Sequence, residues 1–472
     1  MLARTRRGRW VRTSAVTELL AALTAELRPD QIDTSASARA LFSRGESTAV
    51  SREPDVIVYP ETTEDVQAVM RVATRLRAAV TPVGANSSLE GHTVPLRGGV
   101  SLSLARMNSI VEIAAEDFLA VVQPGVTYPR LNEVLRPTGL FIPVDPGAEA
   151  SLGGMASTNA AGTMTVRYGV MADQVLALEV VLADGTVIRT GGRARKSSSG
   201  YQLTRLFCGA EGTLGVLTEL TLKLTPRPVH VAGARASFAD VGACVAYVTA
   251  LVQAGAALAR CELVDAPSIA AINRHLGPGL VEAPTVFLEF HGDSHTTAAD
   301  AAAALELAVE HGASTSAVAK DEDELRVLWR ARHQAFYCLT AAHPGMNSLV
   351  TDLAVPVSRL AEVIAASLAV TADAGLPTYV LGHVGDGNFH LTLFFEPDDH
   401  LAETVAVAVH SQLVALTLAA GGTCTGEHGI GFRKLPYVRA EHGAAVDVMW
   451  AIKDALDPLG ILNPGKKLPS RS

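Results

Sequence analysis

The chain has 472 residues, of which 48% are apolar and 18% charged, with 40 glycines and 23 prolines. This composition is typical of a folded globular protein, and at roughly 100–200 residues per domain the length predicts about two to four domains. The formal net charge of −9 argues against the basic surface that a nucleic-acid partner requires. The five cysteines are dispersed without a CxxC pair, which is typical of reduced thiols and favours a cytoplasmic protein, with peripheral membrane association left open.

The chain begins with a basic segment. Neither the apolar run nor the small-residue cleavage site of a secretory signal follows it, so we interpret it as a basic tail, with a transit peptide as the less favoured alternative. Ser14 is the predicted N-cap of a helix over residues 16–27. The arginines of the basic tail are Arg4, Arg6, Arg7, Arg9 and Arg12.

From residue 54 onward the pattern predicts alternating strands and helices. Residues 56–59 form a short strand that Pro60 ends, residues 62–79 an amphipathic helix and residues 80–83 a second strand, so the domain starts as a β-α-β unit. Asp184-Gly185 between two apolar runs predicts a hairpin. Further predicted strands cover residues 99–104, 119–123, 176–182, 186–190 and 214–224.

Pro226-Arg227-Pro228 is a predicted domain boundary. Beyond it, alanine-rich helical stretches alternate with strands at 285–291, 348–354 and 378–382, which predicts a second α+β domain. The uncharged run at 241–259 is interrupted by polar residues and is predicted as a buried helix rather than a membrane span. We therefore predict four segments: an N-terminal helical extension at 1–53, domains at 54–228 and 229–424, and a C-terminal segment at 425–472.

Three segments combine glycine with small hydroxyl or amide residues, at 82–92, 145–162 and 209–215. Glycine lets several backbone N–H groups point into one concavity, as a pyrophosphate requires. Tight turns explain any one of these segments, but three in one region favour a phosphate-bearing cofactor. No strand-linked GxGxxG and no GxxxxGK[ST] occurs, so a Rossmann site and a P-loop are both disfavoured.

His383 and His390 flank a Gly-Asp-Gly-Asn turn between two strand-like runs. Such a hairpin would bring both imidazoles to the same end of a sheet. Glu427 follows in a glycine-rich loop, and two histidines with one carboxylate leave coordination positions open, as a catalytic divalent metal requires. The spacing alone leaves a polar hairpin with surface histidines open. For Cys424 we favour a buried thiol over a metal ligand.

Several long stretches resemble one family of flavoproteins: residues 144–148, 166–169, 211–215, 382–390 and 421–430. They are similar to the vanillyl-alcohol oxidase and p-cresol methylhydroxylase superfamily, and within it to the FAD-dependent D-2-hydroxy acid dehydrogenases of the mitochondrial D-lactate type. The resemblance covers nearly all of the chain after about residue 30. It implies an α+β fold with a two-subdomain FAD-binding domain at 54–228, a substrate (cap) domain with an antiparallel sheet at 229–424, and a segment at 425–472 that returns to the FAD domain.

The resemblance implies FAD bound without a covalent link, since a hydrogen-bonding role for His92 is favoured over covalent attachment. Residues 84–89 and 151–157 would surround the pyrophosphate, and Gly212, Thr213 and Val216 would lie near the adenosine half. The candidate cofactor-binding residues are Pro82, Gly84, Ala85, Asn86, Ser87, Ser88, Leu89, Pro146, Gly147, Ser151, Gly153, Gly154, Ser157, Gly162, Glu211, Gly212, Thr213, Val216 and Asn463.

The resemblance also assigns zinc or manganese to His383, His390 and Glu427. A redox-inactive ion suits this chemistry, because the flavin takes the electrons. His428 is the candidate general base, since its reference pKa of about 6.5 suits proton abstraction near neutrality. Arg332 is the candidate clamp for a substrate carboxylate, with Arg330 as the second choice and a solvated helix face as the alternative for both.

The implied reaction is oxidation of a D-2-hydroxy acid to the 2-oxo acid, with hydride transfer to flavin N5. Relatives that act on D-2-hydroxyglutarate carry a lysine just before the strand that here contains Asp352, and an asparagine where Thr392 stands. Both are absent, which favours a monocarboxylate such as D-lactate. The alternatives are a glycolate oxidase catalytic subunit, a D-2-hydroxyglutarate dehydrogenase, a metallohydrolase and a catalytically silent flavin subunit. Cytochrome, quinone, an electron-transfer flavoprotein and oxygen all stay open as electron acceptors, as does a homodimer.

Overall fold

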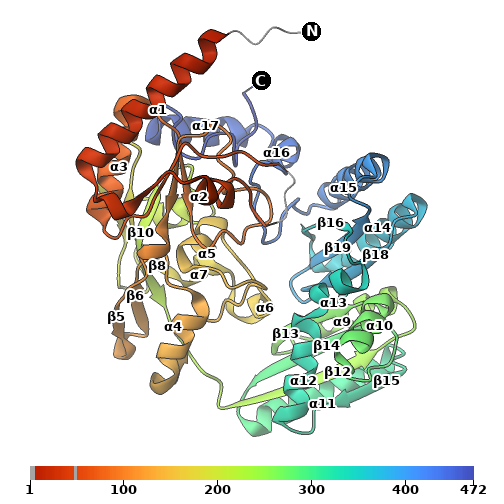
Figure 1. Ribbon diagram of the computed structural model, residues 1–472. Coiled ribbons are helices and arrows are strands. Elements are labelled where there is room, and N and C mark those ends of the chain that lie inside the picture. Colours follow the sequence, from red (N-terminus) through yellow and green to blue (C-terminus); the bar gives the residue numbers. More distant parts are fainter. Residues whose placement is uncertain (1–5, 47–49, 472) are drawn as a thin grey trace. The chain divides into compact units, whose positions relative to one another are not determined.

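The computed structural model describes residues 6–46 and 50–471. Contacts within the chain divide it into two compact units (Figure 1). Unit 1 comprises Met1–Ala160, Val170–Pro226 and Glu427–Ser472, and unit 2 comprises Ala161–Gly169 and Arg227–Gly426. Both therefore consist of segments that are distant in the sequence. Arg4 of the predicted basic tail lies outside the described residues, and the predicted borders after residues 53, 228 and 424 stay predictions.

The first sheet of unit 1 has the strand order β1-β2-β4-β3. β2 and β3 each pair with β4 in parallel, and β1 pairs with β2 antiparallel. The crossover helix α3 (Thr63–Leu76) begins at a capping box, in which Thr62 and Asp65 each accept the other's backbone N–H. This confirms the predicted β-α-β start. The strands are β1 (Ile32–Asp33), β2 (Val56–Val58), β3 (Val80–Val83) and β4 (Val100–Ser103).

Helix α1 (Arg6–Glu26) packs beside α3, as Figure 1 shows in red. Leu19 and Leu23, four residues apart, are buried in the same apolar cluster as Val66 and Met70 of α3. The predicted N-cap at Ser14 is wrong, because the helix starts eight residues earlier, at Arg6. The residues before Ser14 include no proline to end the helix there.

The second sheet of unit 1 has the order β5-β6-β10-β8-β9 and is antiparallel throughout. Gly185, with φ +86°, lies in the turn between β8 and β9, so the predicted hairpin is confirmed. Its strands are β5 (Ile110–Ala114), β6 (Leu119–Val122), β8 (Val175–Val181), β9 (Val187–Gly191) and β10 (Val216–Lys223).

Short helices and one small ribbon complete unit 1. They connect the strands and cover the apolar cluster that includes Leu152, Met155 and Leu220. The ribbon pairs β7 (Leu140–Phe141) with β11 (Thr225–Pro226). The helices are α2 (Ala36–Leu41), α4 (Tyr128–Leu135), α5 (Leu152–Thr158), α7 (Met171–Gln174), α8 (Leu203–Phe207), α16 (Leu435–His442) and α17 (Ala445–Leu456).

Unit 2 is built on a sheet with the order β15-β12-β14-β13-β18-β19-β16, and β17 pairs with β19. Every pairing is antiparallel, which confirms the sheet type implied by the family resemblance. The predicted strand at 348–354 is two strands, β16 and β17. The bounds are β12 (His230–Ser237), β13 (Leu258–Val264), β14 (Thr285–Gly292), β15 (Thr315–Val318), β16 (Asn347–Val350), β17 (Leu353–Ala354), β18 (Thr378–Gly382) and β19 (Asn388–Phe395).

Helices cover both faces of this sheet. On one face Leu328 and Leu339 pack into a cluster with Phe287, and on the other Cys261 lies near Tyr247 of α9. Residues 241–253 of the predicted buried helix form α9. The five cysteines are present as thiols, and Cys424 is fully buried. The helices are α6 (Thr165–Tyr168), α9 (Val241–Gln253), α10 (Ala266–Leu276), α11 (Ser294–Glu310), α12 (Glu322–His333), α13 (Ala335–Ala342), α14 (Leu360–Ala374) and α15 (His400–Ala419).

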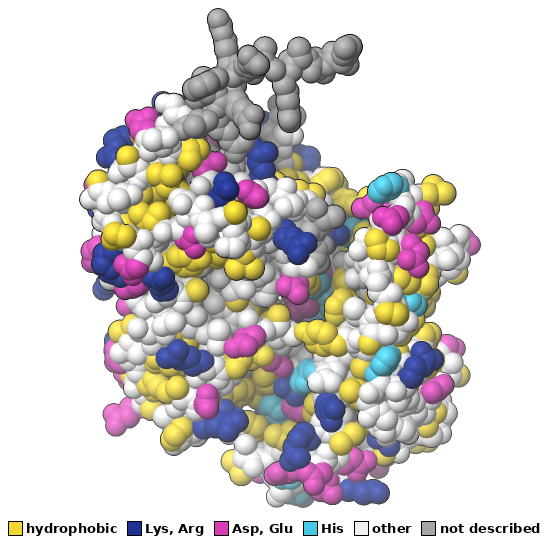
Figure 2. All heavy atoms as spheres, in the orientation of Figure 1, with side chains coloured by type: hydrophobic (Ala, Val, Ile, Leu, Met, Phe, Trp, Pro, Cys, Tyr) yellow, Lys and Arg dark blue, Asp and Glu magenta, His cyan; other side chains and the backbone are white. Residues whose placement is uncertain are grey.

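Helix α15 is long and predominantly apolar. Among the described residues it is the one helix long and apolar enough to cross a membrane, although helices in the cores of water-soluble proteins share these properties. It packs against α14 and β19. Figure 2 shows acidic side chains beside apolar ones over the part of unit 2 where Figure 1 labels α14 and α15.

Candidate functional site

Two of the three glycine-rich segments meet in unit 1. A Cβ atom added at Gly84, just after β3, would lie 2.3 Å from Ser151 Oγ, so the absence of a side chain permits this approach. Ser151 is the N-cap of α5 and accepts the N–H of Gly154 at 3.4 Å. Within α5, a Cβ at Gly153 would lie 2.4 Å from Pro124 Cβ. Glycine is therefore required where the backbone segments touch.

The segment at 85–88 fits the phosphates of a dinucleotide. Within the described part of the chain, the N–H groups of Ala85, Asn86, Ser87 and Ser88 donate to no backbone or side-chain acceptor. Ser88 Oγ is buried and has no hydrogen-bond partner among these residues. A buried hydroxyl needs a partner, and a pyrophosphate supplies several acceptor oxygens for Ser88 Oγ and the neighbouring N–H groups. The donor set therefore fits FAD.

The third segment adjoins the first. Gly212 has φ +69°, and a Cβ there would lie 3.1 Å from Pro82 Cγ. Asn463 Nδ2 donates to the carbonyls of His92 at 3.1 Å and Glu211 at 2.7 Å. The C-terminal segment is thus tied to the predicted flavin-binding segments within unit 1.

The other predicted cofactor residues differ in their burial and in their hydrogen-bond partners. Thr213 Oγ1 donates to the carbonyl of Ala210 at 2.7 Å, and Val216 is buried in β10. The Pro146 carbonyl accepts from Tyr128 at 3.4 Å, and no atom lies within 4 Å of a Cβ built at Gly147. Gly162 belongs to unit 2, where its N–H donates to Thr165 Oγ1 at 2.9 Å. The direct cofactor contacts of all these residues stay predictions.

Glu211 fastens the loop that carries His428. Its carboxylate accepts the N–H groups of Ile430 and Gly431, each at 2.8 Å, and lies 3.2 Å from Lys467 Nζ and 3.3 Å from His92 Nε2. Burial alone would raise the pKa of Glu211, but Lys467, His92 and the N–H donors hold it well below its usual range. Both ring nitrogens of His92 are buried and form no hydrogen bond with the described residues, so the hydrogen-bonding role of His92 stays a prediction.

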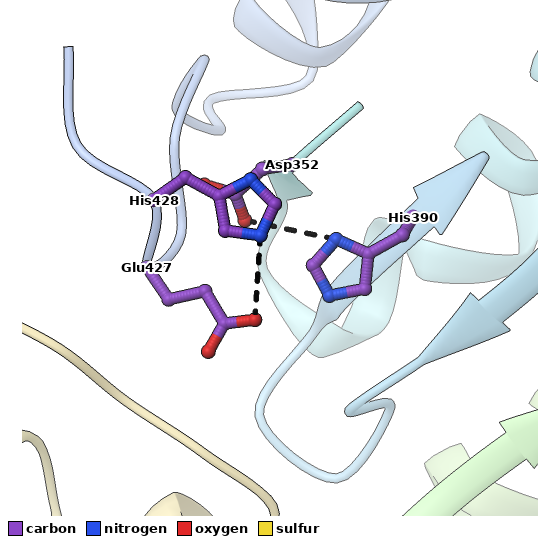
Figure 3. Close-up of side chains that lie close together, drawn as sticks. All are labelled: Asp352, His390, Glu427 and His428. Atoms are coloured by element: carbon purple, nitrogen blue, oxygen red, sulfur yellow. Dashed lines mark ion pairs between the residues drawn. The ribbon is translucent and has the colours of Figure 1, made fainter. Parts of the chain in front are cut away.

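His428 lies between two acidic side chains of unit 1. Its Nε2 is 3.8 Å from Glu427 Oε1, the pair marked by a dashed line in Figure 3, and its Nδ1 is 3.6 Å from Glu90 Oε1. Glu90 is buried beside Lys434, whose Nζ is 3.3 Å away. Burial opposes ionisation, but Lys434, His428 and Arg433 lower the pKa of Glu90 to about 2. Glu90 lies in the glycine-rich segment at 82–92 but was given no role of its own, and Lys434 belongs to no recognisable motif.

The predicted histidine hairpin is confirmed in unit 2. His383 follows β18 directly, His390 lies in β19, and β18 pairs with β19 in antiparallel register. The two ring centroids are 5.4 Å apart, with the ring planes at 85°. Gly387 in the connecting turn has φ +85°, and a Cβ there would lie 2.1 Å from the Val355 carbonyl oxygen. The turn chemistry read from the sequence therefore brings both imidazoles together.

Hydrogen bonds assign the tautomers of both histidines. His383 Nδ1 lies 2.7 and 2.9 Å from the two oxygens of Glu262, and His390 Nδ1 lies 2.9 Å from the Thr351 carbonyl oxygen. A carbonyl and an ionised carboxylate only accept, so each Nδ1 carries the hydrogen. A neutral ring with its hydrogen on Nδ1 has its lone pair on Nε2, which is the arrangement found in histidine ligands of a divalent metal. This pair fits zinc or manganese.

Asp352 is a further acidic group beside the hairpin. It is fully buried, and its Oδ1 lies 3.9 Å from His390 Nδ1, the second dashed pair in Figure 3. It accepts from Asn388 Nδ2 at 3.0 Å and from Thr425 Oγ1 at 2.7 Å. Sequence reasoning gave Asp352 no role in the site, because a single aspartate in a strand-like run carries no signal of its own.

Glu427 follows directly on Gly426, the last residue of unit 2. A Cβ at Gly426 would lie 2.2 Å from Asn388 Nδ2 and 3.1 Å from Asp352 Oδ1, so the backbone at Gly426 presses against both residues. Glu427 is the next residue, and a trans peptide bond separates successive Cα atoms by about 3.8 Å. The predicted carboxylate ligand therefore follows directly on the loop that unit 2 holds in place.

The predicted carboxylate clamp is buried in the last turn of α12. Arg332 is 8% exposed and its Nη2 lies 2.5 Å from Glu262 Oε2, whereas Arg330 points to solvent. Arg332 Nε is buried and has no hydrogen-bond partner among the described residues. The helix-face alternative thus applies to Arg330 and not to Arg332, which keeps a donor for a ligand.

Comparisons with known proteins show the family of this chain. Residues 54–191 match the family described as FAD binding domain, and residues 227–467 match the C-terminal domain of FAD linked oxidases. A probable mitochondrial D-lactate dehydrogenase of Danio rerio is 41% identical, covering 97% of this chain and 93% of its own. A mitochondrial cytochrome-type D-lactate dehydrogenase of Arabidopsis thaliana is 39% identical, over 88% and 74%. A glycolate oxidase subunit of Bacillus subtilis (strain 168) is 33% identical, over 93% and 94%.

The solved structure of p-cresol methylhydroxylase matches with a TM-score of 0.81 at 19% identity, covering 97% of each chain. At this identity the likeness shows the fold, which is the predicted α+β type with its FAD-binding domain. Both domain families follow one another along the chain, and relatives 41% and 39% identical match most of it. The protein therefore belongs to the FAD-linked oxidases and is an FAD-linked oxidoreductase.

Proposed function

We propose that this protein oxidises a D-2-hydroxy acid with a single carboxylate, such as D-lactate, to the 2-oxo acid. One observation of unit 2 carries the proposal. Arg332, a buried cation with a free donor, shares Glu262 with His383, one of two histidines whose Nε2 lone pairs suit a metal. A carboxylate clamp beside a metal-type histidine pair matches a 2-hydroxy acid, which offers a carboxylate and an adjacent hydroxyl. The D-lactate dehydrogenases named among the relatives support this substrate.

Arg332 would bind the substrate carboxylate. A guanidinium is always ionised and forms bidentate hydrogen bonds with a carboxylate, so it fixes orientation as well as position. Its burial strengthens the interaction, because water competes less for the same donors. The residue therefore sets which face of the substrate carbon is presented for oxidation.

His383, His390 and Glu427 would hold zinc or manganese. When bound, the metal would lower the pKa of the substrate hydroxyl and FAD would accept the hydride. Asp352 lies beside His390 and stabilises the cation site electrostatically. His428 would take the hydroxyl proton on Nε2, while Glu90 faces Nδ1 at 3.6 Å and orients the ring.

The residues around the hairpin favour a monocarboxylate. Thr392 follows His390 by two residues on β19 and is 1% exposed, and no lysine precedes the strand that leads to Asp352. A substrate such as D-2-hydroxyglutarate would bring a second carboxylate without a cation at these positions, and an unpaired buried charge is costly. Glycolate is the second candidate, because it is also a small monocarboxylate and a glycolate oxidase subunit is 33% identical.

We further propose a cytochrome as the electron acceptor and the cytoplasm as the location, with peripheral membrane association as the alternative. The printed name of the Arabidopsis relative specifies a cytochrome type. Quinone, an electron-transfer flavoprotein and oxygen are the competing acceptors. Parallel assays of the reduced enzyme with cytochrome c, a soluble quinone, an electron-transfer flavoprotein and oxygen separate these choices.

Anaerobic reduction of the purified protein tests the substrate. The flavin absorbance is expected to bleach with D-lactate and to persist with L-lactate and with D-2-hydroxyglutarate. Bleaching by glycolate alone would favour the second candidate. Faster reduction by D-2-hydroxyglutarate than by D-lactate would overturn the monocarboxylate assignment, and a protein without flavin after gentle purification would overturn the proposal as a whole.

A further inference from the structure

One buried carboxylate, Glu262, connects the two parts of the proposed site in unit 2. It lies in the middle of β13 and is fully buried. Its Oε1 lies 2.7 Å from His383 Nδ1, and its Oε2 lies 2.9 Å from the same nitrogen and 2.5 Å from Arg332 Nη2. The loop after β18 and the end of helix α12 are thus held by the same side chain.

The charges around Glu262 are balanced. An isolated buried carboxylate would be strongly disfavoured, and here Arg332 supplies the opposite charge. Arg332 Nη2 lies 2.5 Å from Glu262 Oε2, and this positive charge favours the ionised carboxylate. A carboxylate accepts the hydrogen of His383 Nδ1, so Nε2 is the nitrogen on which the neutral ring carries its lone pair. The carboxylate also uses only part of the Arg332 guanidinium, whose Nε has no partner among the described residues.

We propose that Glu262 is a positioning residue that couples metal retention to binding of the substrate carboxylate. The inference rests on the proposed function and deepens it. Glu262 fixes the tautomer and orientation of His383 and, through the other oxygen, the plane of the Arg332 guanidinium. The distance between the metal ligand and the carboxylate clamp is therefore set by one side chain rather than by two independent ones.

A neighbouring residue provides a matched control. Glu289 on β14 lies on the same face of the sheet, since its register partner is Arg260, two residues from Glu262 on β13. It is also buried and also holds one arginine and one histidine, Arg260 at 3.2 Å and His291 at 2.7 Å. Its partners are outside the proposed metal and substrate groups. Glu262 and Glu289 thus share chemistry and setting but differ in what they position.

The test compares Glu262→Gln with Glu289→Gln in the full-length, FAD-containing protein. Binding of Mn²⁺ and Zn²⁺ is measured by calorimetry and by metal content after dialysis, which needs no turnover. Loss of an outer hydrogen-bond partner of a histidine ligand is expected to weaken metal binding by about 10–100-fold in Glu262→Gln. With metal at saturation, KM for D-lactate is expected to stay at least about tenfold raised, because Arg332 has lost its charged anchor. Glu289→Gln is expected to match the unmodified protein in both readouts.

A structural role alone would give a different pattern. If Glu262→Gln and Glu289→Gln changed metal affinity and KM equally, the coupling would be disproved. If Glu262→Gln does not fold, Glu262→Asp keeps the charge on a shorter side chain. It is expected to retain flavin and the thermal midpoint while losing part of the metal affinity, and unchanged metal affinity would also disprove the coupling. If the unmodified protein does not oxidise D-lactate, the proposed substrate is wrong. The comparison of metal affinity between the two variants still tests the role of Glu262.

Discussion

The flavin-binding segments of unit 1 and the histidine hairpin of unit 2 present ligand-binding groups in opposite ways. In unit 1 the donors are backbone N–H groups of residues 85–88, and side chains have to be absent where the segments touch. In unit 2 the groups are side chains, His383, His390 and Arg332, each oriented by a buried acceptor. The two regions should therefore respond to opposite kinds of mutation. Adding a side-chain atom should weaken flavin binding in unit 1, whereas removing a side chain should weaken metal or substrate binding in unit 2.

The largest expected effect is at His390. His390→Ala removes a predicted metal ligand, and turnover of D-lactate should fall by about a thousandfold, since a metal contributes several kcal/mol to such a transition state. Flavin content should not change, because the flavin-binding segments lie in unit 1. Turnover and bound metal are measured together, with His400→Ala as the control, whose side chain is 88% exposed. A variant that lost flavin but retained metal would reverse the assignment of the two regions.

Glu211 tests the one side chain on which unit 1 depends strongly. Glu211→Gln leaves Lys467 without its buried partner and should lower the free energy of unfolding by about 3 kcal/mol, as for other broken buried ion pairs. The folded-state pKa of Glu211 lies below its ordinary value of 4.5, so its stabilisation is present above pH 4.5 and is lost as the pH falls below that value. Urea unfolding of both proteins from pH 7 to pH 3 measures this. If the free energy of unfolding changed with pH in the same way in both proteins, the role given to Glu211 would be contradicted.

Gly153 tests the requirement for missing side chains. In Gly153→Ala the added Cβ would lie 2.4 Å from Pro124 Cβ, and the proline ring cannot rotate away, so α5 has to move. Overpacking of this kind costs about 1–3 kcal/mol, and FAD should bind at least about tenfold more weakly. The flavin-to-protein absorbance ratio after gel filtration measures the loss. Gly192→Ala, where no atom lies within 4 Å of the added Cβ, is the control, and equal retention of flavin by both variants would argue against the backbone site.

The most gradual effect concerns Lys466, whose Nζ donates to the Val94 carbonyl at 2.5 Å. Burial lowers its pKa from 10.5 to about 7, with Glu211 opposing the shift. Between these values the unfolded chain binds one proton more than the folded chain, so stability should increase as the pH rises from 7 towards 10. The slope is at most about 1.4 kcal/mol per pH unit. Lys466→Met should flatten this rise in urea midpoints at pH 7, 8 and 9, and an unchanged slope would assign the rise to other groups.

Local pattern determined much of this protein. The β-α-β start, the Asp184-Gly185 hairpin and the pairing of His383 with His390 depend on neighbouring residues, hydrophobic period and turn chemistry, which are visible in one stretch of sequence. The start of α1 was missed, because a serine that can cap a helix is also tolerated inside one. The division of the predicted strand at 348–354 was missed for a similar reason, since a break in pairing leaves no mark on composition.

Only the tertiary structure decided the supporting acids. Glu262, Glu90 and Asp352 are single charges in ordinary surroundings, and their partners come from positions 36 to 344 residues away. Arg332 was already preferred to Arg330 from the sequence, and the burial of Arg332 supports that choice. A sequence shows which residues can ionise or bind a metal, but the pKa, the tautomer and the orientation are set by groups that folding brings near. The candidate metal ligands and the carboxylate clamp could therefore be predicted from the sequence, whereas the carboxylates that hold them in place could not.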